Sequence, residues 1–322
     1  MVAILILNWN GYEDTIDCLK SLSESENNNY FVIVGDNGSA NNSIDRIIEG
    51  CKKLSIPLVP ENSDVVPPRG VIVKDLKHNN GFAKGNNLMI QYAQKFHPDY
   101  YLLLNNDTVV DKSFLTHLLE FKEDHPDYDV LTPLILYYYD KAKVWNAGGR
   151  LRWGSRKYFY ANKQASSIKE KELISCSFVT GCALFFSPAI LCPDGKVFTE
   201  QFFFGEEDFE FSLRMKDESK KIACVLQSKI YHKVGASTKT KTKNLKKNYV
   251  HYLNRYIDMR QHMKPSEFFV WRSLNNVYIF FLLLKKGNSI KEVRDFMWNL
   301  NREAYLLDSV SKEKFEFVLN VK

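Results

Sequence analysis

The chain has 322 residues, 45% of them hydrophobic and 14% aromatic, which is enough for one large domain or one domain plus an appendage. Its net charge of +6 suits a phosphate-bearing ligand or an anionic membrane surface, but is too small to indicate nucleic acid binding. The six cysteines include no C-x-x-C pair, so we expect reduced, mostly buried thiols rather than a disulfide or zinc framework.

The N-terminal third is predicted to alternate strands and helices. Apolar runs at residues 2–7 and 30–34 have the composition of buried strands, and each ends in small polar residues, N-W-N-G and G-D-N-G-S. Segments 14–22 and 44–48 carry apolar residues at helical spacing. This order is typical of an α/β nucleotide-binding domain. Since neither G-x-G-x-x-G nor a Walker loop is present, we expect other groups to bind the nucleotide.

A segment rich in glycine and asparagine, N-N-G-F-A-K-G-N-N, follows a short predicted strand at 71–73. Its glycines let the backbone approach a ligand closely, and we expect a loop that enters a helix at 88–96. Lys84 could face a phosphate in this loop. The alternative is a solvated turn.

The apolar run at 101–104 has the length and bulk of a buried parallel strand, and it ends abruptly in Asn105, Asn106 and Asp107. Open α/β sheets place their ligands at this end of a central strand. Asp107 can offer a carboxylate to a divalent cation, and Asn105 lies on the same side if the chain stays extended. The alternative is a polar turn in which Asp107 and Thr108 cap a helix.

Further strands and helices are predicted after this site. Helices are expected at 114–121 and 209–216, and a hairpin-like excursion at 151–171. The expected strands are 130–133, closed by Pro133, 178–186, interrupted by Gly181, 223–226 and 230–232.

Three aromatics and three carboxylates, F-F-F-G-E-E-D at 202–208, form a second candidate site. Carboxylates beside phenylalanines suggest a partly desolvated acid or base with a raised pKa. Alternatively, the carboxylates complement the amino end of the following helix, and both interpretations can hold at once. His232 also lies at the end of a predicted strand, although a single histidine is more often structural than a ligand.

The C-terminal part changes in character. A basic linker leads to helical segments whose most apolar stretch, 277–284, ends in Lys285 and Lys286. Such a face is typical of a helix that lies on a membrane, and a helix packed on the main domain or across a dimer is the alternative. The stretch is far shorter than the roughly 18 to 20 residues that span a bilayer, and the N-terminus lacks a basic leader. We therefore expect a cytoplasmic protein, with a peripheral contact at the inner face of the membrane.

Taken in order, these motifs resemble the inverting glycosyltransferases of family 2, and within them the bacterial rhamnosyltransferase-like branch that builds polysaccharides. The matching pieces between residues 6 and 232 are I-L-N-W-N-G, D-N-G-S, N-N-G-F-A-K-G-N-N, L-L-L-N-N-D, W-N-A-G-G, T-G-C-A-L, E-D-F-E-F-S-L-R and Y-H. Y-L-N-R at 252–255 is a looser match in the C-terminal part.

The resemblance implies a GT-A fold at residues 1–237, which is an α/β fold with a mixed, mostly parallel central sheet, followed by a C-terminal helical extension at 238–322. It implies that Asp36 contacts the base or ribose of the donor, and that asparagines at the strand ends and in the glycine-rich loop line the donor. The candidate donor-binding residues are Asn8, Asn10, Asp36, Asn80, Gly81, Lys84, Asn87 and Asn106.

The resemblance also implies a metal site and a base. Asp107 would hold Mg²⁺ or Mn²⁺ on the diphosphate, with Asn105 and His232 as further ligands. Asp208 would be the general base, with the catalytic carboxylate of Glu207 beside it. The family's metal motif usually has two carboxylates, and Asn105 replaces the first with a neutral carbonyl. We expect Asp107 to be wet, and Asp208 to lie in a drier place beside the phenylalanines.

The predicted reaction moves rhamnose or another hexose from a dTDP- or UDP-sugar to a hydroxyl of a lipid-linked cell-surface polysaccharide, such as a capsule or an O-antigen. The cation neutralises the leaving diphosphate, and a single displacement with one base inverts the anomeric centre. A homodimer is expected as a further partner. One alternative is a non-catalytic nucleotide-sugar-binding scaffold. Another is a nucleotidyltransferase, although the basic glycine-rich N-terminal loop of that class is missing.

Overall fold

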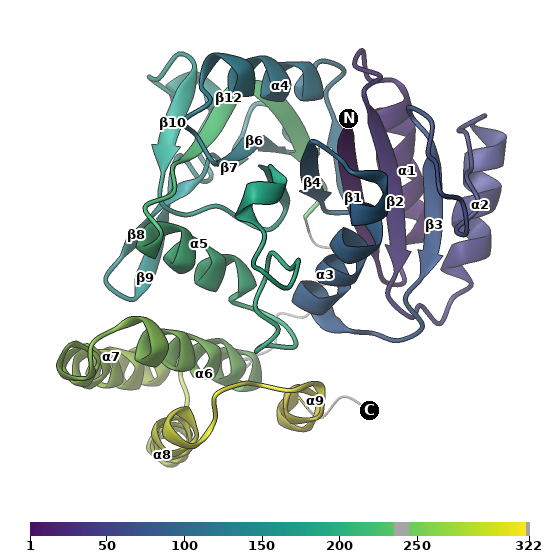
Figure 1. The fold of residues 1–322 in the computed structure, drawn as a ribbon. Coiled ribbons are helices and arrows are strands. Elements are labelled where there is room, and N and C mark those ends of the chain that lie inside the picture. The colour runs from purple at the N-terminus through teal and green to yellow at the C-terminus, as the bar shows by residue number, and fades with distance from the viewer. Residues whose placement is uncertain (235–244, 320–322) are drawn as a thin grey trace.

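The computed structural model describes residues 1–234 and 245–319, whose centre is a ten-stranded mixed sheet in the order β10-β12-β6-β11-β4-β1-β2-β3, with β5 beside β12 and β7 beside β6 (Figure 1). The strands of this sheet are β1 (Val2–Asn8), β2 (Tyr30–Asp36), β3 (Val71–Asp75), β4 (Tyr100–Leu104), β5 (Thr108–Val110), β6 (Val130–Tyr137), β7 (Val144–Asn146), β10 (Leu173–Cys176), β11 (Ala183–Phe186) and β12 (Ile222–His232). A separate hairpin consists of β8 (Gly149–Arg152) and β9 (Ser155–Tyr158).

The helices accompany these strands in the alternating order expected of an α/β fold. They are α1 (Tyr12–Ser23), α2 (Ser43–Lys53), α3 (Gly81–Ala93), α4 (Phe114–Asp124), α5 (Glu207–Asp217), α6 (Leu245–His262), α7 (Pro265–Lys285), α8 (Ile290–Leu306) and α9 (Lys312–Leu319). Short 3₁₀ helices lie at Gln94–Phe96, Ala165–Ser167 and Pro188–Ile190.

The parallel part of the sheet explains how the strand ends meet. β3, β2, β1 and β4 are adjacent and parallel, so their carboxyl ends share one edge. Alternate side chains of β1 enter two cores, because successive residues of a strand point to opposite faces. Helices α1, α2 and α4 cover one face, and α3 and α5 cover the other. The predicted α/β fold with a mixed, mostly parallel sheet is confirmed.

Three predicted element boundaries are wrong. Helix α3 begins at Gly81 rather than at residue 88, because buried hydrogen bonds of its asparagines override their low helix propensity. β6 runs through Pro133, and β12 has a bulge between Val225 and Lys229 opposite this proline, which has no N–H to donate. Of the predicted strand 178–186, only Ala183–Phe186 is a strand; Phe178 makes an isolated bridge to Gly149, and the residues between form a buried loop.

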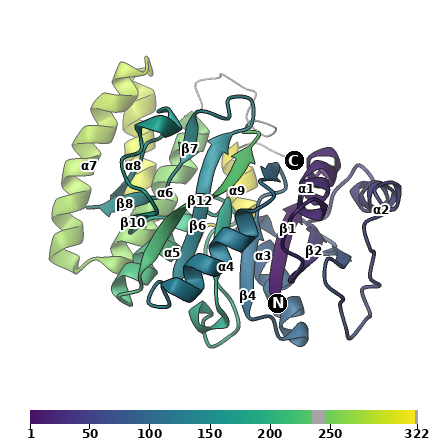
Figure 2. The same cartoon turned by 90° about the horizontal axis from the view of Figure 1, so that it is seen from above.

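The C-terminal helices α6 to α9 build a further apolar cluster and bury residues of the main fold in it, among them Phe178, Phe202 and Phe209. Helices α6 and α7 lie against α5 and the β8–β9 hairpin, and α6, α7 and α8 lie on the opposite side of the molecule from α1 and α2 (Figures 1 and 2). The predicted boundary between residues 237 and 238 lies outside the described residues. No helix in the described part of the chain combines the length and apolar character that crossing a membrane requires.

Helix α7 has two different apolar faces. Phe268, Trp271, Ile279 and Leu283 are buried among the C-terminal helices, so the packing alternative is correct for this face. The opposite face carries large apolar side chains that are at least half exposed. These are Phe269, Val270, Leu274, Val277, Tyr278 and Phe281.

Candidate active site

The ends of β1 and β2 form a polar cluster on the predicted donor side. The parallel register places Asn8 beside Asp36, and the Asn8 amide donates to the Asp36 carboxylate at 2.7 Å. Asp36 also accepts hydrogen bonds from the backbone N–H of Ser39 at 3.0 Å and from its hydroxyl at 2.6 Å. The Thr15 hydroxyl donates to the Asn8 carbonyl at 2.9 Å. Asn8, Thr15 and Asp36 are buried, so their partners fix their orientation.

Asn10 and Asn106 extend this cluster. The backbone of Asn10 is left-handed with φ 56°, and its side-chain carbonyl accepts from the backbone N–H of Ala40 at 2.8 Å. The Asn106 amide donates to the Gly11 carbonyl at 3.2 Å and to the Thr15 hydroxyl at 3.1 Å. The structure therefore brings the strand-end candidates of β1, β2 and β4 together.

The glycine-rich segment contributes unequally. Asn80 donates from its backbone N–H to the side-chain carbonyl of Asn37 at 2.9 Å, next to the donor cluster, and Lys84 is exposed on α3. Gly81 has φ 77°, and a Cβ on it would lie 2.0 Å from the Phe203 carbonyl oxygen, so only glycine fits. Asn87 is fully buried and donates to the Phe198 carbonyl at 2.9 Å. Its side chain thus holds the segment before α5 in place.

Asp107 and His232 lie together, as predicted. β5 pairs with β12, and His232 Nε2 lies 3.0 Å from Asp107 Oδ1. The Trp145 ring meets the His232 ring nearly edge-on, with centroids 4.4 Å apart. The backbone N–H of Lys233 donates to the Asp107 carbonyl at 2.9 Å. Because β5 follows Asp107, the alternative of a helix cap at this position is wrong.

These residues fit a divalent cation in part. The Asp107 carboxylate oxygen and the His232 imidazole nitrogen lie 3.0 Å apart, close enough to bind one cation together. Carboxylate oxygen suits Mg²⁺ and Mn²⁺, and imidazole is a common ligand of divalent transition metals. Among residues 1–234 and 245–319, no group of three or more His, Cys, Asp or Glu side chains could hold a metal. The remaining ligands would therefore have to be the amide of Asn105, diphosphate oxygens and water.

Asn105 and Asp208 line the same pocket, which has a volume of about 520 Å³. Its walls include Thr180 and Gly181 from the main fold, and His251 from α6. The pocket thus joins the end of β4 to the start of α5, and residues of α6 and α9 complete its lining.

The carboxylates at the start of α5 are perturbed by burial. Burial raises the pKa of Glu207 to about 7, and the neighbouring charge of Asp208 adds to this effect. The Glu207 carboxylate accepts from the backbone N–H of Gly205 at 2.7 Å. Burial also raises the pKa of Asp208, while the nearby Arg156 lowers it in part. Both carboxylates lie in the first turn of α5, so they also complement the helix dipole.

The expected contrast between a wet and a dry carboxylate is wrong. The Asp107 side chain is 19% exposed and the Asp208 side chain 23% exposed. Of the three preceding phenylalanines, Phe204 lines the pocket, whereas Phe202 is buried in the C-terminal cluster and Phe203 packs on α9. Asp107 and Asp208 differ instead in their neighbours, since Asp107 meets a histidine and Asp208 an arginine.

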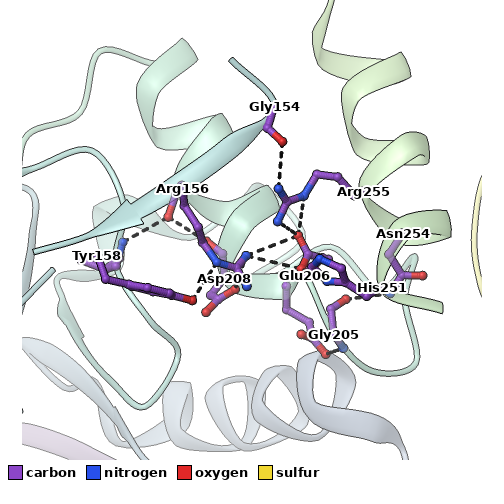
Figure 3. A network of polar contacts seen from close by, with 12 residues as sticks. Gly154, Arg156, Tyr158, Gly205, Glu206, Asp208, His251, Asn254 and Arg255 are labelled. Carbon is purple, nitrogen blue, oxygen red and sulfur yellow. Dashed lines mark hydrogen bonds and ion pairs between the residues drawn. The ribbon is translucent and has the colours of Figure 1, made fainter. Parts of the chain in front are cut away.

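Sequence reasoning missed the charged residues around Asp208 (Figure 3). Arg156 comes from the β8–β9 hairpin, which overlaps the hairpin-like excursion expected at 151–171, but no sequence pattern singled out this arginine. Glu206 was grouped with the carboxylates expected to have a raised pKa or to complement the helix end. It is instead buried and paired with two arginines and a histidine, and its pKa is held well below its usual range. The signal for Arg255 was the Y-L-N-R motif, which lies outside the well-matched region.

The mixed, mostly parallel sheet with α/β connections is consistent with a GT-A fold. The chain matches the model of Glycosyl transferase family 2 over residues 3–187, which is more than half of its length. It therefore belongs to glycosyl transferase family 2. The comparison with curated proteins finds no match.

Solved glycosyltransferases share this fold. The chain is similar to GalNAc-T7 with UDP, GalNAc and Mn²⁺, at 14% identity and a TM-score of 0.60, covering 98% of this chain and 56% of that one. It is similar to the mannosyltransferase PcManGT from Pyrobaculum calidifontis in complex with GDP-Man and Mn²⁺, at 12% identity and a TM-score of 0.52, covering 99% and 72%. It is also similar to S. aureus TarS 1-349, at 12% identity and a TM-score of 0.53, covering 94% and 91%. The predicted family and GT-A fold are confirmed, and the rhamnosyltransferase-like branch stays a prediction.

Proposed function

We propose that this glycosyltransferase inverts the anomeric centre of its donor sugar, and that Asp208 is the general base. The observation that carries this proposal is the shared pocket, in which Asp208 lies with Asn105, two residues from Asp107. A base must reach the acceptor hydroxyl while the donor diphosphate is held nearby. This pocket has room for both, because Asp208 and Asn105 line it together. Arg156 keeps part of the negative charge of Asp208 compensated, which favours the ionised form that accepts a proton.

Asp107, His232 and Asn105 would hold Mg²⁺ or Mn²⁺. When bound, such an ion neutralises the charge that develops on the leaving diphosphate. The adjacency of Asp107 and His232 supports this assignment, as do two structural neighbours that were solved with Mn²⁺. At the ends of β1 and β2, Asn8 and Asp36 are fixed by their hydrogen bonds and would orient the base and ribose.

The proposed substrates are a dTDP- or UDP-hexose, such as a rhamnose donor, and a hydroxyl of a lipid-linked cell-surface glycan. The resemblance to the polysaccharide-building branch supports the acceptor class. The neighbours named with UDP-GlcNAc and with GDP-Man support a nucleotide-sugar donor, without choosing its base.

A donor panel tests this proposal. UDP-, dTDP- and GDP-sugars are supplied with glycan acceptors, with and without Mn²⁺, and the anomeric configuration of the product is read by proton NMR. We expect transfer with one nucleotide class, dependence on the cation and an inverted product. A product with retained configuration would refute a single displacement assisted by one base.

A non-catalytic donor-binding subunit is the second candidate function. It is favoured by Asn105, which replaces a carboxylate of the usual metal motif and leaves two His or Asp side chains at the cation position. Donor hydrolysis separates the two candidates, since an enzyme releases nucleoside diphosphate slowly without acceptor and a silent binder releases none. Metal-dependent release that disappears in Asp107→Ala would exclude the silent binder.

The exposed face of α7 supports a peripheral contact with an anionic membrane. Val270, Leu274, Val277 and Phe281 recur at helical spacing on one stripe. Lysines at both ends of α7 complement anionic headgroups. We expect co-sedimentation with phosphatidylglycerol vesicles that weakens as salt rises, and a loss of binding in the double variant Leu274→Gln, Phe281→Gln. A dimer in solution without lipid binding would assign this face to a second copy instead.

A further inference from the structure

Helix α6 reaches the catalytic segment through two consecutive side chains. The Asn254 amide donates to the carbonyls of Phe204 at 3.2 Å and Gly205 at 2.9 Å. Arg255 Nε donates to Glu206 Oε2 at 2.6 Å, and its Nη2 makes a second contact with the same carboxylate. These two residues belong to the Y-L-N-R motif, and their hydrogen bonds fix the segment 204–206 directly before Asp208 (Figure 3).

Arg255 also fixes the hairpin that supplies Arg156. Its Nη1 donates to the Gly154 carbonyl at 2.9 Å, at the turn between β8 and β9. Gly154 has φ 65°, and a Cβ on it would lie 1.9 Å from Trp271 Nε1 of α7, so the turn lies close against the C-terminal helices. One guanidinium therefore connects α6, the hairpin turn and the start of α5.

Glu206 is the buried charge on which these contacts converge. Its backbone is left-handed with φ 74°, and the residue is 4% exposed. His251 Nδ1 lies 2.8 Å from its Oε1, and Arg156 Nη1 lies 3.3 Å from its Oε2. Burial alone would raise the pKa of Glu206, but Arg255, His251 and Arg156 together hold this pKa well below its usual range. The carboxylate is thus ionised, and its orientation depends on its partners.

Arg156 links this buried charge to Asp208. The same Nη1 that meets Glu206 lies 3.7 Å from Asp208 Oδ1. Both arginines pack on the buried ring of Phe209, with Arg255 Cζ 3.5 Å and Arg156 Cζ 5.7 Å from its centroid. The four charges therefore alternate in a chain, Arg255, Glu206, Arg156 and Asp208, that is drawn from three separate segments.

We propose that Arg255 is a positioning residue for Asp208, acting through Glu206 and Arg156, so that the C-terminal helices complete the active site. The inference rests on the proposed role of Asp208 as the general base. Without Arg255, the Glu206 carboxylate keeps fewer cationic partners and draws Arg156 towards itself. Asp208 then loses both its orientation and part of the positive charge that favours its ionised form.

The charged groups around Asp208 determine how its pKa should shift when Arg255 or Glu206 is replaced. Arg156 and Tyr158 face it from the hairpin, Glu206 and Glu207 from its own helix, and Arg255 from α6. Burial raises the pKa of Asp208, Arg156 and Arg255 lower it, and Glu206 raises it. Removing Arg255 must therefore raise this pKa, and removing the charge of Glu206 must lower it. Loose packing alone would not produce shifts of opposite sign.

The test compares the pH dependence of turnover in Arg255→Met, Glu206→Gln and the double variant. A base acts when ionised, so the acid limb of the wild-type profile follows the pKa of Asp208. We expect the limb to move up by about one pH unit in Arg255→Met and down in Glu206→Gln, with the double variant between them. The KM for the donor should change little, because these residues lie on the acceptor side.

Arg260→Met is the matched control. Arg260 lies on the same helix, but its guanidinium donates to the carbonyls of Tyr305 at 2.8 Å and Leu307 at 2.9 Å, away from Asp208. We expect its acid limb to stay at the wild-type position. Arg255→Lys is the more conservative variant, because it keeps the positive charge. The acid limb of its pH–rate profile should lie between those of the wild type and Arg255→Met.

A titration by ¹³C NMR of labelled carboxylates follows Asp208 without any activity, with its signal assigned by its loss in Asp208→Asn. Shifts of opposite sign in Arg255→Met, or Arg255→Lys if the former unfolds, and in Glu206→Gln support the inference. An unmoved pKa, or shifts in one direction, would overturn it. If Asp208→Asn is inactive while the pKa of Asp208 stays unmoved in the Arg255 and Glu206 variants, only the role of Arg255 fails. If Asp208→Asn keeps full turnover, the proposed function fails, and the positioning role fails with it.

Discussion

The two sides of the active site are held by different physical means. On the donor side, Asp36 is fixed by neutral partners, Asn8 and Ser39, at the ends of neighbouring strands. On the proposed acceptor side, Asp208 is surrounded by buried charges from the hairpin, α5 and α6. Neutral hydrogen bonds give orientation without strong dependence on pH, whereas buried charges couple orientation to protonation. Substitutions in the neutral cluster around Asp36 should thus change donor affinity, and those in the charged cluster around Asp208 should change the rate and its pH dependence.

The largest effect is expected on the donor side, for Asp107→Ala. Loss of the carboxylate removes the charged ligand of the proposed cation, so transfer should be abolished and binding of the nucleoside diphosphate weakened. Turnover and calorimetric binding with Mn²⁺ measure both effects. Asp111→Ala is the control, since Asp111 bonds to Ser113 and should be replaceable. Wild-type turnover of Asp107→Ala in EDTA-treated buffer would refute the metal assignment.

A smaller effect is expected for His232→Ala. Water can take the place of one ligand, so the rate should fall by about 10- to 100-fold at low Mn²⁺ and recover as the ion is added. A titration of the rate against Mn²⁺ checks this. If added ion restores nothing, the contact between His232 and Asp107 serves the fold rather than the cation.

A more modest effect is expected for Asn8→Ala. Its loss leaves the buried Asp36 and Thr15 each without one partner, which costs about 1 to 3 kcal/mol of stability. The donor dissociation constant should rise, while the acid limb of the rate profile stays in place. A shift of the acid limb in Asn8→Ala would contradict the distinction between the two sides of the site, because it would show that the cluster around Asp36 affects the pKa of Asp208.

The smallest effect is expected for Glu207→Gln, read as thermal stability. The pKa of Glu207 rises from 4.5 to about 7 on folding, so between these values the unfolded state loses a proton that the folded state keeps. Wild-type stability therefore declines as pH rises through this window. Glu207→Gln lacks the titrating carboxyl group, so its stability does not decline for this reason. Its melting temperature relative to wild type should therefore increase from pH 4.5 to 7. A constant difference would show that the carboxyl group is not protonated in the fold.

The sequence was sufficient for most of the donor side because its cause is local. A buried strand followed by asparagine and aspartate marks the edge of a parallel sheet, and Asn8, Asp36 and Asn106 do meet there. The start of α3 was not predictable in this way. Asn87 is stabilised in the helix by the Phe198 carbonyl, far away in the chain.

The acceptor side depends on contacts that no local pattern encodes. The sequence indicated Asp208 and its helix, but not that Arg156 from a hairpin and Arg255 from the C-terminal helices would share the Glu206 carboxylate. Similarly, the three phenylalanines were expected to shield Asp208 together, yet the fold sends Phe202 and Phe203 to the C-terminal helices. Charge pairing between residues so far apart in the sequence is a property of the tertiary structure.

The most direct test of the account measures donor affinity and transfer rate together in Asp208→Asn. Asparagine keeps the size and hydrogen bonding of the side chain but cannot accept the acceptor proton. We predict an almost unchanged dissociation constant for the nucleotide sugar and a saturated rate lowered by about 10² to 10⁴. A large loss of affinity with little change in the saturated rate would contradict the account, because it would place Asp208 on the donor side.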